Sequence, residues 1–259
     1  PAAEPPARAL RIETCFPPIE DRLIMSEELP ENAVAVVIGA GGGIGAAVLE
    51  NLRQRGGFGH VLGLGRSSDP ALDLLDEASI ERAALHIAAL PGELRLFFDA
   101  SGFLHGHGFQ PEKSWRDLDP AALAHNFAVN AIGPALLMKH FLPLLPRTGK
   151  AVFATLSARV GSIGDNNLGG WYGYRASKAA LNQLVHTAAV ELKRSRPQAI
   201  CVALHPGTVD TNLSAPFAKS GLAVRPPEEA AADLLAVIDG LVPEQSGGFL
   251  DYRGAPLPW

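Results

Sequence analysis

The stretch Val36–Val48, VVIGAGGGIGAAV, places five glycines in a segment without charge. A run of apolar, mostly β-branched residues leads into the glycines and an alanine-rich helical pattern follows them, which predicts a strand, a tight turn and a helix. A flexible linker would be polar, and clustered glycines are unfavourable in a membrane-spanning helix. Such a turn presents backbone N–H groups and a helix N-terminus to an anion, so it favours binding of a dinucleotide phosphate.

The composition is that of a globular protein. The chain has 259 residues, is 47% hydrophobic and carries a net charge of −5. It can therefore bury a full core as one large domain or two small ones. The chain has no basic run and no signal-like apolar segment near its start, so we expect no nucleic-acid or membrane partner. Cys15 and Cys201 are too few for a disulfide framework, which indicates a reduced, cytoplasmic setting.

The first thirty residues differ in pattern from the rest. They are rich in proline and irregular, whereas a strand-first domain could begin near Met25. We expect residues 1–30 to form an N-terminal arm or extension, and an extra edge strand at Ala9–Cys15 is an equal alternative. Residues 31–259 are expected to form one domain, because no shift in composition divides them.

Strand and helix patterns alternate after the glycine stretch. Besides the strand that ends at Ile38, the expected strands are His60–Gly65, Leu94–Ala100, Lys150–Leu156, Ala199–Leu204 and Gly248–Tyr252. The expected helices are Ile44–Arg55, Ser79–Ala89, Pro120–Leu145, Tyr174–Ser195 and Pro227–Leu241. Apolar strands separated by helices predict an α/β fold, a single Rossmann-type doubly wound parallel sheet of about seven strands with helices on both faces.

Tyr174 and Lys178 form the strongest candidate for a catalytic pair. Residues four apart lie on one face of a helix, so the ammonium can favour the phenolate and lower the pKa of the phenol. The tyrosine would then act as an acid or base near neutral pH. An isolated pair with this spacing is more often an exposed helical pair, so the pair needs supporting motifs elsewhere.

Supporting motifs are present. The chain contains Gly39-x-x-x-Gly43-x-Gly45, Asn130 in VNAIGP, Ser157, Tyr174-x-x-x-Lys178, and HPGTVDT at residues 205–211. With these motifs in this order, residues 33–259 resemble the short-chain dehydrogenase/reductase family. Residues 157–183, SARVGSIGDNNLGGWYGYRASKAALNQ, look most like the C-factor-like branch of this family. The resemblance implies an oxidoreductase that interconverts a carbonyl compound and its alcohol with a nicotinamide cofactor.

The resemblance also implies roles for four catalytic residues. Tyr174 would be the proton donor or acceptor, and Lys178 would lower its pKa and bind the nicotinamide ribose. Asn130 would kink its helix and anchor a water that relays protons to Lys178. Ser157 would hold the substrate oxygen. The family often has two serines here, with the second as catalyst, whereas Ala158 follows Ser157 in this chain. Ser162 is therefore kept as an alternative to Ser157.

The segment after the second strand indicates which cofactor is used. Gly65 stands where enzymes that use NAD place an acid, and Arg66 follows it, ready for a bidentate contact with a 2′-phosphate. Ser67 is a second donor. This pattern predicts NADP(H) in preference to NAD(H), and the alternative is an arginine that faces solvent.

Other cofactor contacts follow from the resemblance. They are Gly39, Gly43, Ile44, Gly45, Asp73 near the adenine, Gly102, Tyr174, Lys178, Pro206, Gly207, Val209 and Thr211. One departure affects this set, because the usual Asn-Asn-Ala-Gly reads Asp99-Ala100-Ser101-Gly102 in this chain. Binding should survive this change, since the glycine remains.

The substrate pocket is expected at the carboxyl ends of the strands. Its segments are residues 103–109, 165–171 and the loop 205–225, which together carry few charges. They predict a small, uncharged carbonyl compound as substrate. His105 and His107 lack a third ligand at a supporting spacing, so no metal is expected.

Two further expectations concern assembly and an alternative function. The helices Pro120–Leu145 and Tyr174–Ser195 have apolar faces on more than one side, which together with the resemblance predicts a homodimer or homotetramer. The alternative function is a non-catalytic NADP(H)-binding regulatory or signalling protein of the same fold. The intact Tyr174 and Lys178 count against this alternative.

Overall fold

A computed structural model describes residues 29–217 and 224–259 of the chain. The predicted N-terminal arm, and the alternative strand Ala9–Cys15, lie outside the described residues. Six predicted strands all occur in one sheet. They are β1 (Val34–Ile38), β2 (His60–Leu64), β3 (Leu94–Asp99), β4 (Ala151–Leu156), β5 (Ala199–His205) and β6 (Phe249–Asp251).

The sheet confirms the predicted doubly wound α/β fold. Its order is β2-β1-β3-β4-β5-β6, and every neighbouring pair is parallel. The strands are apolar along nearly their whole length because helices cover both faces. The chain runs outward from β1 to β2 and then returns to the other side of β1 with β3. The order therefore reverses at β1, and a ligand crevice is expected beyond the carboxyl ends of β1 and β3.

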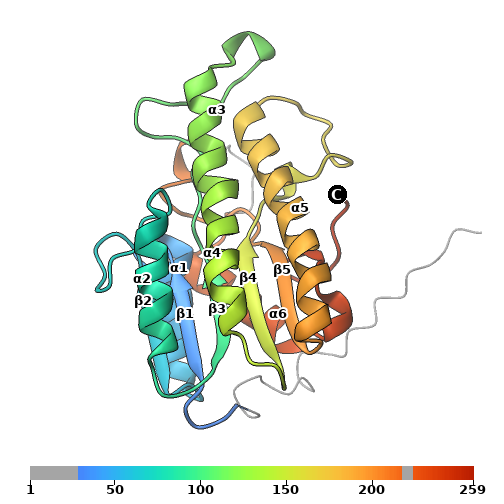
Figure 1. Cartoon of the computed structure of the whole chain (residues 1–259). Helices are drawn as coiled ribbons and strands as arrows, with labels where there is room; N and C mark the ends of the chain where they lie inside the picture. The colour runs from blue at the N-terminus through green and yellow to red at the C-terminus, as the bar shows by residue number, and fades with distance from the viewer. Residues whose placement is uncertain (1–28, 218–223) are drawn as a thin grey trace, which may run out of the picture.

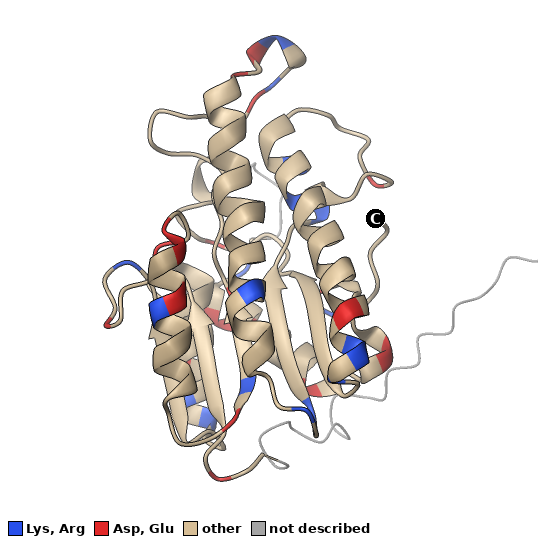
Figure 2. Cartoon of the chain, viewed as in Figure 1, with Lys and Arg blue, Asp and Glu red and all other residues tan. Residues whose placement is uncertain are grey.

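The helices form one layer on each face of the sheet. They are α1 (Gly43–Arg55), α2 (Glu77–Ala88), α3 (Pro120–Phe127), α4 (Gly133–Phe141), α5 (Tyr172–Ser195) and α6 (Pro227–Gly240). Figure 1 shows α2, α4 and α5 in front of the sheet and α1 behind it. A core of side chains from α2, α4 and α5 covers one face, and a second core from α1 and α6 covers the other. Figure 2 shows acidic and basic positions interspersed over the near side, without a continuous stretch of either sign.

The single helix predicted at Pro120–Leu145 is interrupted. A π turn at Ala128–Ile132 separates α3 from α4, and a 3-10 turn at Leu142–Leu144 follows α4. A π turn is rare in helices and is often found at functional sites. By length and mean hydropathy, 1.3, the run Pro120–Leu144 could cross a membrane, but here it packs against α2 and α5.

Candidate active site

The glycine turn joins β1 to α1 and folds tightly on itself. Gly39 has a φ of +75°, and its carbonyl accepts the N–H of Gly42 at 2.9 Å. A Cβ on Gly45 would lie 2.3 Å from the Gly39 carbonyl oxygen, so glycine alone allows this approach. Gly42 precedes α1 and provides no side-chain cap. The first amides of α1, at Gly43 and Ile44, are therefore suited to an anion.

The segment that follows β5 approaches the same turn. Pro206 and Gly207 begin it, and Gly207 has a φ of +81°. Val209 is buried. A Cβ on Gly43 would lie 2.8 Å from Thr211 Cγ2, so Thr211 is in close contact with the start of α1. The fold thus brings together glycine-turn and post-β5 residues that are far apart in the sequence.

The predicted 2′-phosphate residues lie beside the glycine turn. Gly39 donates its N–H to the last residue of β2 at 3.0 Å, and Gly65 follows that residue directly. The Ser68 hydroxyl accepts the Gly65 N–H at 2.9 Å and so fixes the turn. Arg66 and Ser67 are exposed, and no acid among the described residues pairs with the Arg66 guanidinium. The structure therefore leaves the predicted role of Arg66 open to test.

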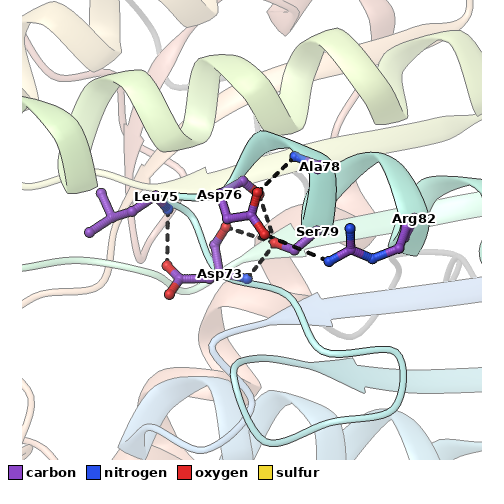
Figure 3. Close-up of polar contacts among 6 residues, drawn as sticks. All are labelled: Asp73, Leu75, Asp76, Ala78, Ser79 and Arg82. Carbon is purple, nitrogen blue, oxygen red and sulfur yellow. Dashed lines mark hydrogen bonds and ion pairs between the residues drawn. The ribbon is translucent and has the colours of Figure 1, made fainter.

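Asp73 lies in the turn before α2, within the local network that Figure 3 shows. Its Oδ1 accepts the N–H of Leu75 at 2.9 Å. The Ser79 hydroxyl donates to the carbonyls of Asp73 and Asp76, at 3.0 and 2.7 Å. These bonds fix the backbone of the turn and one carboxylate oxygen. A contact of Asp73 with adenine stays a prediction.

Tyr174 and Lys178 are both buried on α5, as the four-residue spacing allows. The predicted lowering of the phenol pKa is opposite to the direction found, because burial raises the pKa of Tyr174 to about 12. The Lys178 ammonium donates to the Leu156 carbonyl at 2.8 Å. Burial lowers the pKa of Lys178 to about 8, and the charge of Asp99 opposes that shift. The four-residue spacing predicted that both side chains lie on one face of the helix. It did not predict that burial removes water from both groups, and this loss of water sets the direction of both pKa shifts.

Asn130 stands in the π turn and connects three elements. Its Oδ1 accepts the Phe103 N–H at 2.7 Å, and its Nδ2 donates to the Phe103 carbonyl at 2.8 Å. The same Nδ2 donates to the Ser177 hydroxyl on α5 at 3.1 Å. A Cβ on Gly102 would lie 3.8 Å from both Asn130 Oδ1 and Lys178 Nζ. The structure thus gathers three of the predicted site residues at one point.

The predicted role of Ser157, to hold the substrate oxygen, stays a prediction. Its hydroxyl donates to Asn182 Oδ1 at 2.6 Å. Asn182 lies one turn beyond Lys178 and eight residues beyond Tyr174 on α5, about 12 Å along the helix axis. The structure therefore holds the Ser157 hydroxyl away from the start of α5. The alternative, Ser162, is buried and accepts the backbone N–H of the third residue after it at 3.1 Å.

The three segments predicted to set specificity meet beside Tyr174. His105 Nε2 lies 3.1 Å from the Asn212 carbonyl, and the ring centroids of His105 and Phe217 are 5.3 Å apart. Trp171 lies 5.2 Å from Phe217 and 6.2 Å from Tyr174, both between ring centroids. Rings from all three segments therefore form a continuous wall that ends at the phenol. No group of three acids, histidines or cysteines within the described residues could hold a metal ion.

Comparison with known proteins identifies the family. A family model described as enoyl-(acyl carrier protein) reductase matches residues 61–231, which include β2 to β5 and the Tyr174 and Lys178 pair. The chain belongs to the short-chain dehydrogenase/reductase family. The chain is thus an oxidoreductase by family, and the predicted resemblance is confirmed.

Individual relatives support the same assignment. The C-signal of Myxococcus xanthus, a C-factor-like member, is 40% identical over 144 residues, 55% of this chain and 82% of that protein. The 1-hydroxy-2-glutathionyl-2-methyl-3-butene dehydrogenase of a Rhodococcus species is 30% identical over 88% of this chain and 100% of that protein. The crystal structure of NADPH-bound carbonyl reductase from chicken fatty liver is 24% identical, with a TM-score of 0.75 over 90% of this chain and 96% of that one. That likeness confirms the fold.

Asp99 replaces an asparagine of the family motif in this chain. It is completely buried at the end of β3. Its Oδ2 accepts the Thr155 hydroxyl at 2.7 Å, and its Oδ1 accepts the Ser101 N–H at 2.9 Å. Burial raises the pKa of Asp99, while these donors and the Lys178 charge act in the opposite direction. The departure therefore adds a buried carboxyl group near Lys178.

Asn182 and Glu112 are among the buried polar residues that were not predicted from the sequence. Asn182 continues the four-residue spacing of Tyr174 and Lys178, and that spacing could have identified it. Glu112 is buried and accepts the N–H of Gly173, which lies 61 residues away. No local pattern could have revealed this contact, because its two halves are distant in the sequence.

Proposed function

We propose that this protein is an NADP(H)-dependent oxidoreductase that interconverts a small, uncharged carbonyl compound and its alcohol. The observation that carries the proposal is the burial of Tyr174 and Lys178 on one helix, with Gly102 and Asn130 beside Lys178 and a wall of rings from three loops that ends at Tyr174. The Rhodococcus relative is named as the dehydrogenase of a hydroxy compound, which supports alcohol and carbonyl chemistry.

Tyr174, Lys178 and Asn130 have different roles in proton transfer. A bound nicotinamide supplies or accepts the hydride. Tyr174 gives its proton to the carbonyl oxygen in reduction and takes one from the alcohol in oxidation. Lys178, with a pKa of about 8, is mostly charged at neutral pH and stabilises the negative charge that develops on the phenol oxygen. Asn130 is buried and borders Gly102 together with Lys178, so it is suited to hold a water that relays protons to Lys178.

The residues present fit a dinucleotide phosphate. The uncapped start of α1 and the glycine turn would hold the pyrophosphate, because amides at a helix N-terminus favour anions. The Arg66 guanidinium would bind a 2′-phosphate through two parallel N–H donors, and Ser67 would provide a further donor. Gly65 puts no carboxylate there to repel that phosphate. These features support NADP(H) over NAD(H).

The ring wall supports an uncharged substrate. Trp171, Phe217 and His105 are half-buried and contact one another, so each still offers part of its ring to a ligand. Aromatic side chains contribute apolar surface with few hydrogen-bonding groups. An uncharged carbonyl compound suits this wall better than an anion, which would lose hydration without a paired cation.

The test is a panel of aldehydes and ketones, assayed by NADPH consumption. We expect turnover by the wild-type chain, and loss of at least 100-fold in kcat for Tyr174→Phe, because general acid–base catalysis contributes on the order of 10²- to 10⁴-fold. NADPH affinity should change little, since the removed hydroxyl acts on the substrate oxygen. Turnover at the wild-type rate by the Phe variant would refute the role of Tyr174.

The name of the C-signal relative favours one second candidate, a non-catalytic NADP(H)-binding signalling protein. The same experiment separates the two functions. Binding of NADPH without turnover of any carbonyl compound in the panel would support the signalling protein. Turnover that depends on Tyr174 would support the oxidoreductase.

A further inference from the structure

The start of α5, which carries Tyr174, lacks the usual kind of cap. Helices commonly begin with a serine, threonine, aspartate or asparagine whose side chain accepts an N–H of the first turn. The residue before α5 is Trp171, which has a φ of +52° and makes no side-chain cap. The first-turn amides of the catalytic helix therefore need an acceptor from elsewhere in the fold.

Glu112 supplies that acceptor from the loop between β3 and α3. Its side chain is 4% exposed, and the Gly173 N–H donates to its Oε2 at 3.1 Å and to its Oε1 at 3.3 Å. Its backbone carbonyl accepts the Trp171 N–H at 2.5 Å. Glu112 thus binds two positions, 171 and 173, at the entry to α5. A carboxylate at this end also interacts favourably with the helix dipole.

The packing around Gly173 shows that this contact is built into the site. A Cβ on Gly173 would lie 2.9 Å from Glu112 Oε1 and 3.1 Å from Asn126 Nδ2. The absence of a side chain at Gly173 therefore allows both groups to close on the helix. The Asn130 Nδ2 reaches Asn126 Oδ1 at 3.4 Å, so the same buried region continues to the π turn.

We propose that Glu112 is a positioning residue for Tyr174, because its buried side chain fixes the first turn of α5. Tyr174 directly follows Gly173 and belongs to that turn. Lys178 belongs to the next turn and is held independently by the Leu156 carbonyl. Loss of the Glu112 contact should therefore displace the phenol while the cofactor-binding side of the helix stays in place. This inference rests on the proposed function, in which Tyr174 is the acid and base.

Two substitutions and a matched control test the proposal. Glu112→Leu removes the acceptor at similar size, and Glu112→Gln keeps one acceptor oxygen. Asp117→Ala is the control, because Asp117 accepts the N–H groups of Lys113 and Ser114 in the same loop through its Oδ2. That contact stabilises the loop but does not involve α5. All variants are compared with the wild-type full chain.

We expect Glu112→Leu to lower kcat by about 10- to 100-fold, because misplacement of a catalytic group by about 1 Å can cost two orders of magnitude. Its affinity for NADPH should stay within about twofold of wild type, and Glu112→Gln should recover kcat to within about threefold, because an acceptor remains. Asp117→Ala should leave kcat near that of wild type. A wild-type kcat in Glu112→Leu, or an equal loss in Asp117→Ala, would overturn the proposal.

Hydrogen exchange provides a second measurement that does not depend on turnover. The Gly173 amide should exchange faster in Glu112→Leu than in wild type, and at the wild-type rate in Asp117→Ala. Unchanged exchange in Glu112→Leu would overturn the proposal even if no carbonyl compound is turned over. Failure of the wild-type chain to reduce any compound would instead count against the proposed function.

Discussion

Substitution of Gly45 by alanine tests the phosphate-binding turn most directly. The added Cβ would lie 2.3 Å from the carbonyl oxygen and 2.8 Å from the carbonyl carbon of Gly39. Non-bonded heavy atoms prefer about 3.5–4.0 Å, so the turn or the helix must move by about 1 Å. Both contacts are with backbone, which cannot rotate away. Gly39 has a φ of +75°, which further limits how the turn can adjust.

The expected loss can be estimated from this overlap. An extra methyl in a packed site costs about 1–3 kcal/mol, and 1.4 kcal/mol corresponds to about a tenfold change in an equilibrium constant. The displaced amides of the turn and of α1 are those proposed to hold the pyrophosphate. Gly45→Ala should therefore weaken NADPH binding by about 10- to 100-fold.

Gly41→Ala is the matched control within the same turn. A Cβ on Gly41 has no atom within 4 Å, so this variant should bind NADPH nearly as wild type does. Affinity is measured by titration of cofactor fluorescence, and thermal unfolding without cofactor reports any loss of stability. If both variants bind NADPH within twofold of wild type, the close approach of Gly45 to Gly39 is not needed for binding.

Two further predictions concern the cofactor and acid stability. Arg66→Ala should weaken NADPH binding by about 1.5–3 kcal/mol, the contribution of hydrogen bonds to charged groups, and should hardly change NADH binding. Equal losses of affinity for NADPH and NADH would show that Arg66 has a structural role instead. Burial lowers the pKa of His205 to about 4 from 6.5, so over this range the unfolded chain binds a proton that the folded chain does not. The free energy of unfolding should therefore fall by about 2–3 kcal/mol between pH 6.5 and pH 4, and His205→Gln should reduce that fall in urea unfolding.

The sheet was predictable because its signals are local. The apolar run that ends at Ile38 and the glycines after it define β1 and α1 without any distant contact. The interruption between α3 and α4 was not predictable from local spacing, although the resemblance implied a kink at Asn130. Asn130 bonds to the backbone of Phe103, 27 residues earlier, and its side chain also reaches α5. A pattern of apolar spacing reports which face is buried, but not where such a contact alters the helix.

The candidate site was predictable in part for the same reason. The spacing of Tyr174 and Lys178 placed both on one face, and the fold brings Gly102 and Asn130 to them. The direction of the phenol pKa was wrong because spacing does not report burial. Ser157 was assigned by residue type alone. The side chain at that position turns to Asn182, and the direction of a side chain at a strand end depends on the packing around it.

Burial and the Lys178 charge act in opposite directions on the pKa of the Tyr174 phenol. Burial raises the pKa of the phenol to about 12, which keeps Tyr174 protonated at neutral pH but makes it a weaker acid than a phenol in water. Oxidation of an alcohol needs the phenolate, which burial disfavours and the Lys178 charge favours. The buried Asp99 helps to keep that charge, because it opposes the lowering of the Lys178 pKa. In the proposed mechanism both directions of reaction therefore depend on the Lys178 charge, because burial alone disfavours the phenolate that forms in reduction and that oxidation requires.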